Sequence, residues 1–374
     1  MQTKIILTLL LTILLINACN KDKPDDDDNM NMDNDTTAAI IDTLHIDFTN
    51  VPFDNLSEYG FFEDLTNLVP HKALLPYDIN TTLFSNYATK QRLLYMPIDA
   101  QASYHSNGQE TLDFPDETII IKTFYYENDF TDSSQGKRLL ETRLLIRQDG
   151  EWIPASYHWN EDQTEAVRSV VTKVLNVDWI HFDGSERNEY YVIPKQDDCK
   201  GCHSLNEEMV LIGPKAHYLN KDYDYTDGTM NQLKKWESMG KLTGLPTMSE
   251  VPTVAAEGDV NASIDSRARA YLDINCGHCH NEYGPANNSG LFLDIYQTDS
   301  FKLGFCKPPV AAGGGSGGLE YGIVPGNPDE SIMIYRLNSL EPDVSMPELA
   351  RSVIHEEGLQ LLRDWIETIE GDCD

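Results

Sequence analysis

The stretch Ile274-Asn275-Cys276-Gly277-His278-Cys279-His280-Asn281 contains the pattern Cys-x-x-Cys-His. This spacing is typical of c-type haem attachment. Two thiols on one helical turn can form thioethers with the two vinyl groups of a porphyrin. The histidine that follows them then gives the iron its proximal imidazole. The pattern therefore predicts a covalently attached haem c, held by Cys276 and Cys279 with His280 as the iron ligand.

A second copy of the pattern lies upstream, at Cys199-Lys200-Gly201-Cys202-His203. It predicts a second covalent haem c on Cys199 and Cys202, with His203 as the proximal ligand. The alternative is a zinc site made from the two Cys-x-x-Cys pairs. The trailing histidine of both pairs and the 74 positions between Cys202 and Cys276 favour haem.

The N-terminus has the features of a targeting segment. An apolar run at residues 5–16 follows Lys4 and is too short to span a bilayer. It ends in Ile16-Asn17-Ala18-Cys19, which resembles a lipobox and predicts a signal peptide over residues 1–18 with a lipid on Cys19. An ordinary secretory peptide cut near Ala18 is the alternative.

Residues 19–43 are acidic and polar, a composition that cannot form a core and predicts a disordered tether. Together with the lipid, this tether predicts a location in the cell envelope. We expect attachment to the outer membrane through the N-terminal lipid, with the protein facing the periplasm or the cell surface.

The charge of the chain restricts its partners. There are 61 acidic and 28 basic residues, a formal net charge of −33. Such a surface repels nucleic acid and anionic lipid, and it favours basic partners or cations. The hydrophobic fraction of 40% is typical of globular proteins, and 374 residues are enough for two or three domains.

The seven cysteines divide by role. Four belong to the two haem motifs and Cys19 is the predicted lipid site. Cys306 and Cys373 remain, an even pair in an oxidising compartment, which predicts a disulfide. Two free buried thiols are the alternative.

Residues 44–194 have a β pattern. Predicted strands cover residues 118–126, 138–147 and 152–159, and Asp149-Gly150 is a strong hairpin signal between the last two. Asp183-Gly184 predicts another hairpin. We expect an antiparallel β-sandwich-like domain.

The rest of the chain is predicted to bind the haems. Residues 195–258 form a short first haem-binding segment, and residues 259–374 form an all-α cytochrome c domain. In that domain a helix with Ser263 or Asp265 as its N-cap leads to Cys276. A final amphipathic helix at about residues 355–369 is expected to cross it.

The sixth iron ligands are predicted from methionine positions. Met346 precedes Pro347 and lies 66 positions after His280, so it is the predicted ligand of the second haem. For the first haem Met209 is favoured because it follows the motif closely. Core packing is the alternative role for each methionine. Further candidates for the first haem are Met230, Met239, Met248 and His217.

The sequence resembles a family of bacterial two-haem c-type cytochromes that combine an N-terminal β domain with a C-terminal cytochrome c domain. The likeness covers residues 43–373. It implies haem attachment at the two cysteine pairs, proximal His203 and His280, distal Met346, and electron transfer. The matching stretches include Leu75-Pro-Tyr-Asp-Ile-Asn80, Glu141-Thr-Arg-Leu-Leu145, Trp159-Asn-Glu-Asp-Gln-Thr164, Ile193-Pro-Lys-Gln-Asp-Asp-Cys-Lys-Gly-Cys-His203, Val324-Pro-Gly326 and Met346-Pro347.

The predicted function is therefore electron transfer by an exported, lipid-anchored dihaem cytochrome that exchanges electrons with a redox partner protein. No catalytic residue is assigned. The alternative is an oxidoreductase, either similar to a dihaem peroxidase or the cytochrome subunit of a dehydrogenase, with an open sixth position at the first haem. A third possibility is a binding module whose β domain contacts the partner.

Overall fold

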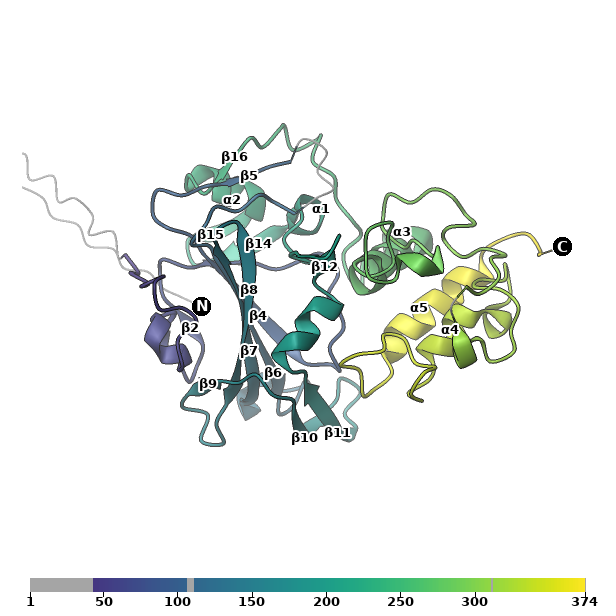
Figure 1. Ribbon diagram of the computed structural model, residues 1–374, viewed down its shortest axis with the longest axis horizontal. Coiled ribbons are helices and arrows are strands. Elements are labelled where there is room, and N and C mark those ends of the chain that lie inside the picture. The colour runs from purple at the N-terminus through teal and green to yellow at the C-terminus, as the bar shows by residue number, and fades with distance from the viewer. Residues whose placement is uncertain (1–42, 106–110, 311, 374) are drawn as a thin grey trace, which may run out of the picture. The chain divides into compact units, whose positions relative to one another are not determined.

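The structure is a computed structural model that describes residues 43–105, 111–310 and 312–373 (Figure 1). The predicted signal peptide, nearly all of the predicted tether and Cys19 lie outside these residues, so the lipid anchor stays a prediction. Across the described ranges, every helix is too short or too polar to cross a bilayer.

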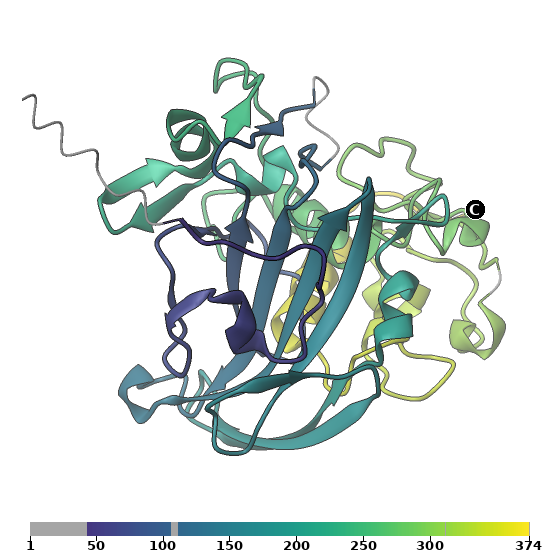
Figure 2. The same cartoon turned by 60° about the vertical axis from the view of Figure 1, so that its left-hand side comes forward.

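The largest element is a six-stranded antiparallel sheet (Figure 2), in which a short turn joins β7 (Lys137–Gln148) to β8 (Glu151–Trp159). The turn between them has positive φ at Asp149 (52°) and Gly150 (80°), which suits the twist of a two-residue hairpin. This predicted hairpin is confirmed. In spatial order the strands are β3 (Leu75–Pro76), β4 (Thr89–Tyr95), β6 (Ile119–Glu127), β7 (Lys137–Gln148), β8 (Glu151–Trp159) and β9 (Ala166–Arg168).

The second predicted hairpin is also confirmed. Strands β10 (Lys173–Ile180) and β11 (Glu186–Ile193) pair along their whole length, with Asp183-Gly184 in the turn. They form a separate two-stranded sheet that packs on the end of the large sheet through buried aromatic side chains. These side chains are Phe124, Tyr126, Trp179 and Tyr191.

The predicted β-sandwich is wrong. Among the described residues, every sheet other than the large one has two strands. One face of the large sheet packs against the N-terminal segment with η1 (Leu56–Tyr59), β1 (Phe62–Asp64) and β2 (Val69–Pro70). The other face packs against α1 (Ala216–Leu219) and α2 (Gln232–Ser238). Both faces are thus buried by irregular chain and short helices, which removes the need for a second sheet.

The predicted first haem-binding segment, residues 195–258, shares its core with the β-rich region. A single apolar cluster contains Leu94 of β4, Trp236 of α2 and Ile274, which follows the segment in the sequence. The small sheets of this part are β12 (Ser204–Leu205) with β13 (Glu208–Met209), β14 (Asp222–Tyr225) with β15 (Gly228–Asn231), and β5 (Ala102–Ser103) with β16 (Leu242–Thr243).

The predicted all-α cytochrome c domain at residues 259–374 is also wrong. Between residues 278 and 331 the chain is mostly turns, with two isolated β-bridges, Phe305 to Ile323 and Tyr321 to Ser331. Gly304 in this stretch has a φ of 106°, outside the helical region. The helical elements are α3 (Ile264–Leu272), the π-helical η4 (Asp273–Gly277), η5 (Asn287–Ser289), η6 (Gly313–Ser316), η7 (Pro328–Glu330), α4 (Ile332–Leu337) and α5 (Glu356–Glu367).

The two helices expected in this region do form and pack together. Ser263 caps α3 by accepting a hydrogen bond from the backbone N–H of Ser266. The indole N–H of Trp365 in α5 donates to Asp265 Oδ1 at 2.9 Å. Gly358 lies directly against the ring of Tyr271, so any side chain there would collide with it.

A disulfide joins Cys306 to Cys373, the pairing expected from the cysteine count, with a Cα–Cα distance of 5.2 Å. It closes a loop of 67 positions and ties the C-terminal tail to the turn-rich region between α3 and α4.

Candidate functional site

The first motif follows β11 directly. Cys199 lies in the 3-10 helix η3 (Gln196–Gly201), and the backbone N–H groups of Cys202 and His203 donate to its carbonyl at 3.2 and 2.9 Å. The β12–β13 hairpin comes next. It brings the carbonyl of Val210 to 2.8 Å from His203 Nδ1.

The second motif continues α3. The helix changes to the π-helical turn η4, which contains Cys276. The backbone N–H groups of Cys279 and His280 donate to the Cys276 carbonyl at 3.0 and 2.8 Å. His280 Nδ1 lies 3.3 Å from the hydroxyl of Ser289, and that hydroxyl donates to the Ala286 carbonyl at 2.7 Å.

The two motifs thus have the same local structure although they lie 77 positions apart. In both, the first cysteine's carbonyl accepts hydrogen bonds from the second cysteine and the histidine. In both, histidine Nδ1 faces an acceptor oxygen, so Nδ1 carries the proton and Nε2 keeps its lone pair. Burial lowers the pKa of His203 and of His280 to about 4. The two imidazoles are therefore neutral at pH 7, as metal ligation requires.

The four motif cysteines are free thiols that are partly accessible. None is consumed by a disulfide, and each pair has the spacing that thioether formation needs. The donor set of each motif therefore fits a c-type haem: two thiols and one neutral imidazole with a free Nε2.

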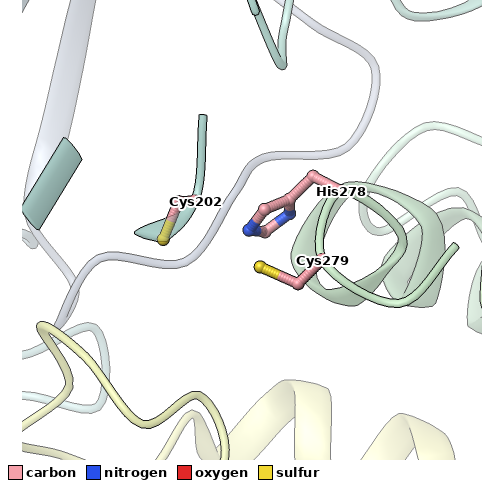
Figure 3. Close-up of side chains that lie close together, drawn as sticks. All are labelled: Cys202, His278 and Cys279. Carbon is pink, nitrogen blue, oxygen red and sulfur yellow. The ribbon is translucent and has the colours of Figure 1, made fainter. Parts of the chain in front are cut away.

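The two motifs lie side by side. The ligand atoms of Cys202, His278 and Cys279 are all within 4.8 Å of one another, and Figure 3 shows the three side chains pointing toward a common centre. Two contacts join the motif regions. Cys279 Sγ lies 3.6 Å from the Gly201 carbonyl, and the backbone N–H of Asn206 donates to the Tyr283 carbonyl at 3.1 Å.

This arrangement argues against a zinc site made from the two Cys-x-x-Cys pairs. The group of possible metal ligands contains one cysteine from each motif and His278, without Cys199 or Cys276. A four-cysteine site is therefore not assembled. Hydrogen bonds from Cys279 and His278 lower the pKa of Cys202, and the contact with Cys202 raises the pKa of Cys279.

A buried polar network holds the second motif against α1. Asp273, in η4, accepts hydrogen bonds from the Tyr218 hydroxyl at 2.5 Å and the Ile295 N–H at 3.0 Å. His217 Nε2 lies 3.2 Å from Asp273 Oδ2, the oxygen that also accepts from the Tyr218 hydroxyl. Burial alone would raise the pKa of Asp273, but the hydrogen bonds and the charge of Lys215 outweigh it and lower that pKa.

The sixth-ligand candidates for the first haem have other environments. Met209 pairs with Ser204 across the hairpin, so it points to the opposite side from His203, and it packs against the large core. Ligation of the first haem by Met209 stays a prediction. His217 is buried, and its Nε2 faces Asp273. Met248 packs on the same core, and Met230 and Met239 are exposed.

Met346 lies in the loop between α4 and α5. Its N–H donates to the Arg336 carbonyl at 3.2 Å, and the charge of Arg336 is one of the factors that lower the pKa of His280. In the same loop Leu349 packs directly over Gly201 of the first motif. The loop is thus close to both motifs, and ligation by Met346 stays a prediction.

Sequence reasoning missed the partners of the two proximal histidines. Val210 and Ser289 follow His203 and His280 by seven and nine positions, as a hairpin partner and a turn residue. No spacing rule distinguishes these positions before folding. The chemistry of metal-bound histidine gives only the general signal, which is that Nδ1 needs an acceptor.

Comparison with protein-family models, with curated proteins and with solved structures found no match. The resemblance to two-haem c-type cytochromes therefore rests on the motifs of the sequence.

Proposed function

We propose that the protein is a two-haem c-type cytochrome that transfers electrons. The observation that carries this proposal is the pair of Cys-x-x-Cys-His motifs, which adopt the same turn and lie next to each other. When bound, each haem supplies an iron that changes oxidation state by one electron. Neighbouring motifs suit exchange of electrons between the two haems.

The residues of the chain have defined roles in this proposal. The thiols of each motif hold one porphyrin, and Nε2 of His203 or His280 holds its iron. The Val210 carbonyl and the Ser289 hydroxyl fix the orientation of these imidazoles. Burial of both histidines keeps them neutral and limits access of water to the proximal side.

The proposal extends to the location and the partner. The leader and Cys19 suggest export and lipid anchoring to the outer membrane. The net charge of −33 favours a redox partner with a basic docking surface. Electron transfer with such a partner should slow as ionic strength rises.

Mass spectrometry of the protein made in a host that matures c-type cytochromes tests the proposal. We expect two covalent haems per chain. Replacing Cys199 and Cys202 by alanine should remove one haem, and replacing Cys276 and Cys279 should remove the other. A wild-type chain without bound tetrapyrrole would contradict the proposal.

One observation favours the alternative function of a haem enzyme. Met209 packs against the large core, and the sixth position of the first haem is open if Met209 keeps that contact when the haem is bound. An open position there would bind carbon monoxide when reduced, or peroxide when oxidised. Spectra unchanged by both reagents would exclude the enzyme. Loss of the thioether–iron absorption in Met346→Ala would identify the ligand of the second haem.

A further inference from the structure

Seven polar side chains and the ring of Phe124 form a strip across one face of the large sheet, on strands β4, β6, β7 and β8. The strand register places them in two parallel rows. The first row is Arg92, Lys122, Arg143 and Ser156, and the second is Lys90, Phe124, Glu141 and His158. We call these eight residues the cationic strip. Apolar clusters that contain Leu94 and Tyr126 lie at its two ends.

The cationic strip has four positive side chains and one carboxylate. Glu141 is fully buried and pairs with Arg143 at 2.6 Å. Arg92 pairs with Asp78, from outside the strip, at 2.7 Å. Among the described residues, no carboxylate lies within ion-pair distance of Lys90 or Lys122. The Lys122 ammonium lies 4.9 Å from the centre of the Phe124 ring.

Two observations show that these cations are crowded and incompletely satisfied. Arg92 is 6% exposed, and its Nη2 has no hydrogen-bond partner. Burial lowers the pKa of Lys90 to about 7, and burial followed by the charges of Arg92, Lys90 and Arg143 lowers the pKa of Lys122. Like charges that lie together on a buried or partly buried face are unfavourable unless an anion lies among them.

The strip lies beside the first haem motif. The motif helix η3 and strand β13 both contact β8, the strand that carries Ser156 and His158. The charge of Arg143 acts on Cys199, and the charge of Lys122 acts on His203. Tyr191, at the end of β11 that leads into the motif, donates to Glu141 Oε1 at 2.8 Å.

We propose that the cationic strip binds the two propionate carboxylates of the haem attached at Cys199 and Cys202. This inference rests on the proposed function. A haem carries two carboxylates, and the strip offers Lys122 and the free Nη2 of Arg92 as donors. Lys90 donates to the Leu83 carbonyl at 3.0 Å and has further N–H groups for a carboxylate. Charge-assisted hydrogen bonds of this kind fix orientation as well as charge. A free inorganic anion has the same chemistry, so the experiment must separate the two.

The test compares the reduction potentials of both haems in the full-length, haem-loaded protein. Lys122→Gln should lower the potential of one haem and leave the other unchanged, because loss of a nearby positive charge favours ferric iron. Lys122→Arg should keep the wild-type potential. Lys200→Gln is the matched control, since Lys200 lies in the same motif but is exposed, so solvent should screen its charge. If Lys122→Gln does not fold, Lys90→Gln replaces it as the test variant.

Each outcome decides the inference separately from the proposed function. A selective shift in Lys122→Gln that exceeds the shift in Lys200→Gln supports the propionate site. Equal shifts in both variants, or two haems with unchanged potentials, overturn it while leaving the cytochrome intact. Stabilisation of the haem-loaded protein by inorganic phosphate that is lost in Lys122→Gln would also overturn it, because propionates would already fill the strip.

Discussion

Asp273→Asn should weaken the attachment of the second haem motif to the rest of the fold. Asp273 begins the turn that contains Cys276, and its side chain is 3% exposed. The substitution keeps the shape of the side chain and the bond from the Ile295 N–H. It removes the charge that faces His217 and Tyr218.

The magnitude follows from the burial of this network. Removing a buried charged acceptor leaves its donors without a partner, which costs about 1–3 kcal/mol. The retained backbone bond from Ile295 favours a loss of about 2 kcal/mol. Tyr218→Phe removes one hydrogen bond to the same carboxylate and should cost about 1.5–3 kcal/mol. The double variant should lose less than the sum, because both changes act on one network.

The pH dependence has a definite sign. The pKa of Asp273 is lowered in the folded protein relative to its ordinary value of 3.8. Its contribution is therefore fully present above pH 3.8 and is lost as pH falls through the lowered pKa. The stability difference between wild type and Asp273→Asn should be constant from neutral pH down to about pH 5 and should shrink below pH 4.

Guanidinium unfolding followed by tryptophan fluorescence measures these differences. Asp329→Asn is the control, because Asp329 is 82% exposed in its pair with Arg363 and should contribute about 1 kcal/mol or less. If Asp273→Asn and Asp329→Asn have the same free energy of unfolding, the buried network does not stabilise the second motif.

Three further predictions concern stability and use the same unfolding measurement. Gly358→Ala should cost about 1–3 kcal/mol, because the new methyl group overlaps the ring of Tyr271; an unchanged midpoint would mean that α3 and α5 move apart freely. Replacing Cys306 and Cys373 by serine should cost about 4 kcal/mol of chain entropy, and a reducing agent should destabilise only the wild type. Asn231→Ala removes the side chain that caps α2 and should cost about 1 kcal/mol, whereas Asn231→Asp should retain most of the cap.

Sequence alone predicted the features that depend on neighbouring residues. Asp149-Gly150 and Asp183-Gly184 produce the two hairpins, because glycine accepts positive φ. Ser263 caps α3 because its hydroxyl reaches a free N–H three residues later. The two Cys-x-x-Cys-His motifs are also local, since each has its two thiols and its histidine within five adjacent positions, and the haems expected on them stay a prediction.

The sandwich and the all-α domain were both predicted incorrectly because the pattern of one element does not specify the chain that covers it or connects it to the next. A strand pattern shows that a face must be buried, but it does not show what covers that face. Here the covering segments are the N-terminal chain on one side and α1 and α2 on the other. In the C-terminal region, the helices expected after Ser263 or Asp265 and at about residues 355–369 exist as 264–272 and 356–367, but the chain between them is mostly turns.

Only the tertiary structure decided how the candidate site is arranged. It brought Cys202 next to Cys279, gave Nδ1 of His203 and of His280 an acceptor, and aligned Lys122 with Arg92 and Arg143 across three strands. The sequence determined which groups could bind a haem, since attachment chemistry requires only local spacing. Folding determined which groups lie together, because those contacts join positions tens of residues apart and depend on how the sheet faces are covered.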